Sequence, residues 1–96
     1  MEEVVKIYPF SPSALFQLGR LYFNNNQIEE AISQFKKAIA IFPEYSNAHY
    51  SLATAYTVKG ERELAIKEFE KVLELNPGNE DVLQKIQELK SQSSGQ

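Results

Sequence analysis

A 34-residue internal repeat constrains the fold of this chain more than any other feature of its sequence. When residues 12–45 are aligned with residues 46–79, nine positions are identical. All but two charged pairs are packing residues or prolines: Ala14/Ala48, Leu18/Leu52, Tyr22/Tyr56, Glu29/Glu63, Ala31/Ala65, Ile32/Ile66, Phe35/Phe69, Lys37/Lys71 and Pro43/Pro77. Units of this kind stack, because each buries its apolar face only against its neighbours.

The first unit is predicted to contain two helices. Ser11-Pro12 is a start signal, since a Ser side chain accepts first-turn amide hydrogens and Pro has no amide hydrogen to satisfy. Apolar residues then recur at helical spacing over residues 12–24. The run Asn24-Asn25-Asn26 predicts a tight turn, because Asn tolerates left-handed backbone. A second helix extends to about Ile41 and is closed by Pro43.

The second unit, residues 46–79, repeats the same signals. Ser46 is expected to cap the third helix, and Lys59-Gly60 to make the turn that the asparagines make in the first unit. The fourth helix is expected over residues 62–75. Each unit is therefore a helical hairpin, and the fold class is an all-α solenoid of antiparallel hairpins.

Half-units are expected on both sides of the two full units. Residues 1–10 align with the end of the second helix of a unit, since the 34-residue offset pairs Val5 with Ile39 and Pro9 with Pro43. They are interpreted as the C-terminal turns of a truncated repeat helix. Residues 80–92, capped by Asn79, are expected to form a capping helix, and residues 93–96 a disordered tail.

Composition excludes several classes of function. Ten Lys and Arg against thirteen Asp and Glu give a net charge of −3, which lacks the basic excess that nucleic-acid binding demands. No cysteine is present, so the chain has neither a disulfide framework nor a thiolate zinc site. No apolar run approaches the roughly 20 residues of a membrane span. Met1-Glu2-Glu3 does not open a signal peptide, so a soluble, intracellular segment without direct membrane insertion is expected.

The sequence offers few residues that could form a catalytic site. The single histidine, His49, has no Cys partner and no second His at helical spacing, so neither a triad nor a metal site can be assembled from it. It is interpreted as a partly buried residue between helices. The sequence therefore predicts no enzyme activity, no catalytic or metal-ligating residue and no cofactor.

The two units resemble tetratricopeptide repeats. The family's large-Leu-Gly-Tyr pattern falls on Leu15, Leu18, Gly19 and Tyr22, then on His49, Leu52, Ala53 and Tyr56. Its Ala-Phe-Ala-Pro pattern falls on Ala31, Phe35, Ala38 and Pro43, then on Ala65, Phe69, Val72 and Pro77. The resemblance implies a right-handed superhelix whose first helices line a concave groove that binds a protein or peptide.

Helical spacing selects the residues of the groove face, about 100° from the stripe that meets the hairpin partner. The predicted partner-binding residues are Phe16, Arg20, Phe23, Asn24, Asn47, Tyr50, Thr54 and Thr57. Aromatic residues beside a cation are typical anchors for peptides, and Arg20 can fork onto a carboxylate. The alternative is that Phe16 and Phe23 pack against residues 2–8 or the adjacent helix.

One class of ligand can be assessed directly. Tetratricopeptide proteins that bind the acidic C-terminal tails of heat-shock chaperones use a clamp of Lys, Asn and Arg. The matching positions here are Phe16, Arg20, Ser51, Asp81 and Lys85. Only two carry the required positive charge and Asp81 opposes it, so tight binding of such tails is not expected.

Other functions remain open alternatives. The chain could be a regulatory or assembly segment of a larger, membrane-associated enzyme, or a structural spacer. It could also self-associate head to tail, with residues 80–92 of one molecule docking beside residues 2–8 of another.

Overall fold

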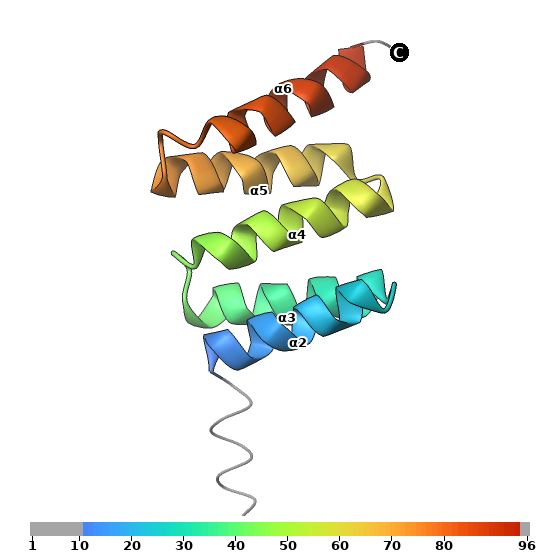
Figure 1. The fold of residues 1–96 in the computed structure, drawn as a ribbon, viewed down its shortest axis with the longest axis vertical. Coiled ribbons are helices and arrows are strands. Elements are labelled where there is room, and N and C mark those ends of the chain that lie inside the picture. Colours follow the sequence, from blue (N-terminus) through green and yellow to red (C-terminus); the bar gives the residue numbers. More distant parts are fainter. Residues whose placement is uncertain (1–10, 95–96) are drawn as a thin grey trace, which may run out of the picture.

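The computed structural model describes the backbone of residues 11–94 and the side chains of residues 11–92. Its elements are α2 (Pro12–Asn24), α3 (Ile28–Ile41), α4 (Ser46–Lys59), α5 (Arg62–Leu75) and α6 (Glu80–Ser94). Figure 1 shows these helices stacked along one axis, with successive helices running in opposite directions. The chain is thus an all-α helical-repeat solenoid. The helical turns expected over residues 1–10 lie outside the described residues.

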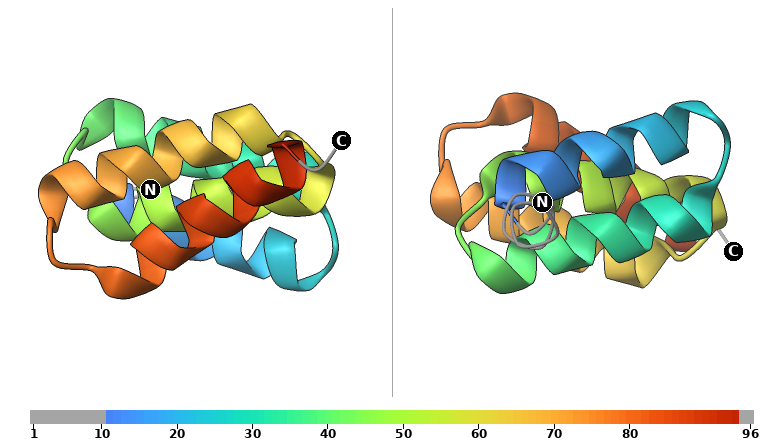
Figure 2. Two further views of the ribbon diagram at one scale, coloured as in Figure 1. Left: turned by 90° about the horizontal axis from the view of Figure 1, so that it is seen from above. Right: turned by 90° about the horizontal axis from the view of Figure 1, so that it is seen from below.

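The solenoid is built from two hairpins and a closing helix. α2 packs against α3, α4 packs against α5, and the α3–α4 and α5–α6 contacts join the successive units. Figure 2 shows the α2–α3 hairpin nearest the viewer from below and α6 nearest from above. No helix in the described part of the chain is long and apolar enough to cross a membrane.

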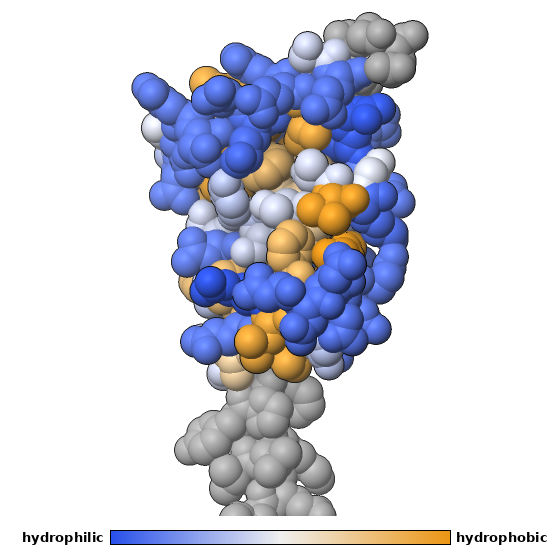
Figure 3. All heavy atoms as spheres, turned by 45° about the vertical axis from the view of Figure 1, so that its right-hand side comes forward, coloured by the Kyte–Doolittle hydropathy of each residue, from blue (hydrophilic) through white to orange (hydrophobic). Residues whose placement is uncertain are grey.

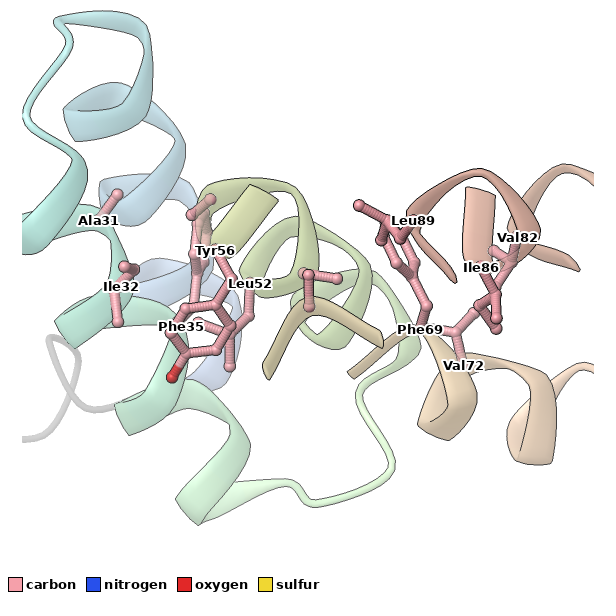
Figure 4. Close-up of a cluster of buried hydrophobic side chains, with 13 residues drawn as sticks. Ala31, Ile32, Phe35, Leu52, Tyr56, Phe69, Val72, Val82, Ile86 and Leu89 are labelled. Carbon is pink, nitrogen blue, oxygen red and sulfur yellow. The ribbon is translucent and has the colours of Figure 1, made fainter. Parts of the chain in front are cut away.

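The core is continuous along this stack. Phe35 of α3 is 1% exposed and Phe69 of α5 is 2% exposed, and both belong to one cluster that extends to α6. Figure 4 shows Phe35 beside Leu52 and Tyr56 of α4, with Phe69 lying toward Leu89 of α6. The repeated aromatic position therefore supplies the largest fully buried side chain of each hairpin.

Local signals explain where most helices begin and turn. The Ser11 hydroxyl accepts a hydrogen bond from the Ala14 amide at 3.1 Å, and Pro12 follows as the first helical residue. Asn26, at φ +66°, and Gly60, at φ +92°, adopt the left-handed backbone that the two hairpin turns require. The Asn79 side chain accepts from the Val82 amide at 3.2 Å and caps α6.

Two predicted helix ends differ in the structure. Ser46 is not a cap but the first residue of α4, preceded by Tyr45 at the cap position. Its hydroxyl instead accepts a hydrogen bond from the Asn76 side chain at 2.9 Å, which links the start of α4 to the loop before α6. α6 continues to Ser94, two residues beyond the expected end, since nothing after Lys90 breaks a helix until Gly95.

Leu18, expected as a packing position because it repeats as Leu52, is not buried in α2. Its side chain is 39% exposed, whereas Leu52, at the same position of the next unit, is 2% exposed. Leu52 lies in the cluster that joins α4 to α3 (Figure 4). No described helix precedes α2, so this side of Leu18 has no described neighbour.

Candidate functional site

Two hollows open between the first helices of successive units. The first, of about 200 Å³, lies between α2 and α4 and is lined by Arg20, Phe23, Asn24, Phe35, Tyr50, Ser51 and Thr54. The second, of about 140 Å³, lies between α4 and α6 and is lined by Thr54, Thr57, Phe69, Lys85, Glu88, Leu89 and Gln92. Because both include Thr54, the two hollows adjoin at α4, and together they form a path of hollows across α2, α4 and α6.

An aromatic ring from the second helix of each unit contributes to the apolar lining of each hollow. Phe35 lines the first hollow and Phe69 the second, and the two residues are 34 positions apart. The Phe35 ring reaches this place because Gly19 of α2 has no side chain. A Cβ at Gly19 would lie 2.5 Å from Cε1 of Phe35, which is well inside van der Waals contact.

Tyr50 connects the two hollows. Its hydroxyl donates a hydrogen bond to Asp81 Oδ2 of α6 at 2.8 Å. Its ring packs edge-on against Phe69, with 5.4 Å between the ring centroids. Burial, then the hydrogen bond to Asp81 and its negative charge, raise the pKa of Tyr50 to about 12. Tyr50 therefore presents a neutral side chain, held in place by contacts on two helices.

The charges along this path are two cations and two carboxylates. Arg20 extends over the Phe16 ring, with 5.9 Å from Cζ to the ring centroid. Lys85 lines the second hollow beside Glu88. Among residues 11–92, neither Arg20 nor Lys85 is in an ion pair. Asp81 already accepts the hydrogen bond from Tyr50, so the first hollow has one cation available to a ligand.

His49 lies outside both hollows and has a structural role, as the sequence indicated. It is 5% exposed. Its Nδ1 lies 2.7 Å from Glu68 Oε1, and its Nε2 lies 2.7 Å from the Pro43 carbonyl oxygen. The carbonyl can only accept, so Nε2–H donates to it. No cluster of potential metal ligands is present in the described residues.

Family models match the chain along most of its length. A model described as "TPR repeat" matches residues 19–60, and two described as "Tetratricopeptide repeat" match residues 46–79 and 1–33. The chain belongs to the tetratricopeptide repeat (TPR) family. No curated protein matches it.

Solved structures agree with the TPR assignment. "Crystal structure of MamA" has a TM-score of 0.86 at 29% identity over 88% of this chain and 50% of MamA. A second MamA structure has a TM-score of 0.88 at 28% identity over 97% and 51%. The TPR chain thus spans about half the length of these neighbours. "First TPR of Spaghetti (RPAP3) bound to HSP90 peptide SRMEEVD" has a TM-score of 0.83 at 26% identity over 92% and 69%.

The structure brings together six of the eight residues that helical spacing selected in the TPR chain. Arg20, Phe23, Asn24, Tyr50 and Thr54 line the first hollow, and Thr57 lines the second. The other two lie outside both hollows. Phe16 is half-buried against Phe35 and Tyr45, with ring centroids 5.8 and 5.3 Å away, as the packing alternative proposed. Asn47 is exposed in the first turn of α4.

Sequence reasoning about one helix face missed the lining residues that other elements contribute. Phe35 and Phe69 were assigned to the core alone, yet they reach both the core and the hollows. Ser51 appeared only among the clamp positions. The signal for the two aromatics was their 34-residue spacing together with Gly19, which marks a close approach to α2.

Proposed function

We propose that the TPR chain binds an extended peptide segment of a partner protein along the face formed by α2, α4 and α6. TPR domains are in general protein-interaction modules. The proposal adds the face at which this chain would bind and the extended form of the bound segment. The observation that carries the proposal is the pair of hollows that share Thr54, each with a phenylalanine ring in its lining. Two adjacent hollows suit an extended chain, which presents side chains at regular intervals.

The polar groups around the hollows could fix the orientation of a bound peptide. Asn24, Ser51 and Thr54 offer amide and hydroxyl groups beside the apolar Phe35 ring in the first hollow. Arg20 adds a cation that its contact with Phe16 holds over the protein surface. A few polar groups around an apolar pocket are the usual composition of a site for one ligand side chain.

To test this, peptides that bind the chain are selected from a displayed random library. The binding site of each peptide is then mapped from the chemical-shift changes of the backbone amides of the chain. Binders to the proposed site shift the amides of Asn24, Ser51 and Thr54. The proposal also predicts that Arg20→Glu weakens these binders at least about tenfold, the effect of losing a charged contact and gaining a repulsive one. Shifts confined to another surface would contradict it.

The matched control is Lys36→Glu. Lys36 is an exposed cation on α3 and lines neither hollow, so the change in net charge is the same and the location differs. Affinity should stay within about twofold of the unsubstituted chain. Equal losses in both variants would mean that only net charge matters, and the groove would then not be the site.

α6 offers less exposed apolar surface for head-to-tail self-association than the sequence suggested. Val82, Ile86 and Leu89 of α6 are 0%, 4% and 6% exposed, because they already pack on α5 within the same molecule. Leu83, at 46% exposed, is the residue of that set that stays accessible. The other half of the predicted contact, residues 2–8, lies outside the described residues.

A further inference from the structure

The hydroxyl groups of Tyr50, Thr54 and Thr57, with which α4 lines the two hollows, already donate their hydrogen atoms within the chain. Thr54 Oγ1 donates to the Tyr50 carbonyl oxygen at 3.0 Å, and Thr57 Oγ1 donates to the Ala53 carbonyl oxygen at 2.9 Å. The Tyr50 hydroxyl donates to Asp81 Oδ2 at 2.8 Å. A hydroxyl has one hydrogen to donate and two lone pairs that accept. Toward a ligand, these three hydroxyls therefore act as acceptors.

α4 adds no unpaired charge to these acceptors. Lys59 is the only Lys, Arg, Asp or Glu of α4, and its Nζ lies 2.7 Å from Glu29 Oε2. At the height of α4, Figure 3 shows pale, weakly polar atoms and apolar atoms between strongly hydrophilic atoms above and below. The charges along the path of hollows come from the flanking helices: Arg20 on α2, and Asp81, Lys85 and Glu88 on α6.

The acceptor oxygens of Tyr50, Thr54 and Asp81 lie together at the α4–α6 side of the first hollow. Thr54 follows Tyr50 by one helical turn, so both lie on the same face of α4. The hydrogen bond from Tyr50 joins Asp81 of α6 to this face. Asp81 is exposed, and an ionised carboxylate accepts hydrogen bonds and donates none. We call these three residues the acceptor junction.

We propose that the bound segment places a Lys or Arg side chain at the acceptor junction, next to a large apolar side chain in the first hollow. This placement rests on the proposed function. A cationic side chain brings several donors and no acceptor, so it complements oxygens that can only accept. A carboxylate there would meet the charge of Asp81 and no donor from Tyr50 or Thr54. The apolar neighbour is expected because Phe23 and Phe35 line the first hollow.

The two cations of the path limit where the basic side chain can lie. Lys85 follows Asp81 by one turn of α6 and lines the second hollow. Arg20 lines the first hollow from α2. Each repels a ligand cation that moves away from the acceptor junction. An acidic residue of the segment belongs near Arg20, and the basic residue belongs across α4 from it.

The peptides selected from the displayed library test this chemistry. Among those that shift the amides of Asn24, Ser51 and Thr54, one position should be enriched in Lys or Arg. Replacing that residue by methionine, which keeps an unbranched side chain without the charge, should weaken binding about fivefold at low salt. Groove-bound peptides without a basic preference would overturn the acceptor junction and leave the proposed function intact. If no peptide maps to the hollows, both are wrong.

Substitutions in the chain locate the basic side chain. Thr54→Val removes the acceptor oxygen and keeps a β-branched side chain, and Asp81→Asn removes the charge at similar size. Each should weaken the basic peptide about three- to tenfold and leave its methionine version within about twofold, with an unchanged thermal midpoint. Thr57→Val is the matched control, because Thr57 makes the same kind of hydrogen bond but lines only the second hollow. Equal losses for both peptides, or equal effects of Thr54→Val and Thr57→Val, would contradict the placement.

Discussion

At the scale of single residues, Gly19 determines how closely α2 approaches Phe35. Replacing Gly by Ala in an exposed helix interior stabilises it by about 1 kcal/mol, but here the added Cβ would lie 2.5 Å from a ring that is 1% exposed. The steric cost of this contact should exceed the gain in helix propensity. We therefore expect Gly19→Ala to reduce the free energy of unfolding by about 1–3 kcal/mol in urea denaturation. Gly78→Ala is the control, because nothing lies within 4 Å of its Cβ position, and it should cost less than about 0.5 kcal/mol.

Tyr50 gives the groove a pH-dependent contact. Its pKa is raised from 10.0 to about 12, so its neutral form is favoured by folding. The contribution to stability is therefore complete below pH 10 and is lost as the pH rises from 10 toward 12. Titration of tyrosinate absorbance should show one late component that Tyr50→Phe removes. Asp81→Asn should lower this pKa only part of the way, because burial is the larger cause; a full return to 10 would contradict that order.

At the scale of the elements, the two hairpin turns both need a residue with left-handed backbone, and they use different residues for it: Asn26 in the first turn and Gly60 in the second. Gly60 has φ +92° and nothing lies within 4 Å of its Cβ position, so Gly60→Ala should be penalised through backbone strain alone. We expect a loss of about 1 kcal/mol in the free energy of unfolding. Asn26→Gly, at φ +66°, should be neutral within about 0.5 kcal/mol, since Gly adopts this conformation freely. An equal loss at both sites would show that side-chain contacts, not φ, set the cost.

The helices were predictable from the sequence because start signals, turn residues and apolar spacing agree over short distances. α2, α3 and α5 lie where these signals place them. The failures involve contacts between elements. Phe16 packs against the rings of Phe35 and Tyr45, which lie outside α2. The spacing of residues within α2 does not predict these contacts. Tyr50 was expected as a free anchor, but Asp81, 31 residues away, holds its hydroxyl.

At the scale of the whole molecule, the stack converts a sequence period into a continuous face. Each unit contributes one first helix, so lining residues recur across α2, α4 and α6, and a phenylalanine from a second helix adds to the apolar lining of each hollow. The charges do not recur. Arg20 has no cationic counterpart at Thr54, and α6 carries Asp81, which accepts the hydrogen bond from Tyr50, as well as Lys85. The face formed by α2, α4 and α6 therefore carries two adjoining hollows without a cluster of positive charge.

This charge distribution leads to a prediction for the peptide SRMEEVD, which the RPAP3 neighbour binds. We expect its dissociation constant with this chain to be weaker than micromolar, because its acidic groups meet Asp81 and Glu88 as well as Arg20 and Lys85. Asp81→Asn removes one repulsive charge and should strengthen binding by about two- to fivefold at low salt, a gain that high salt abolishes. Fluorescence anisotropy of a labelled peptide gives both values. Submicromolar binding by the unsubstituted chain would show that the two separated cations suffice as a clamp.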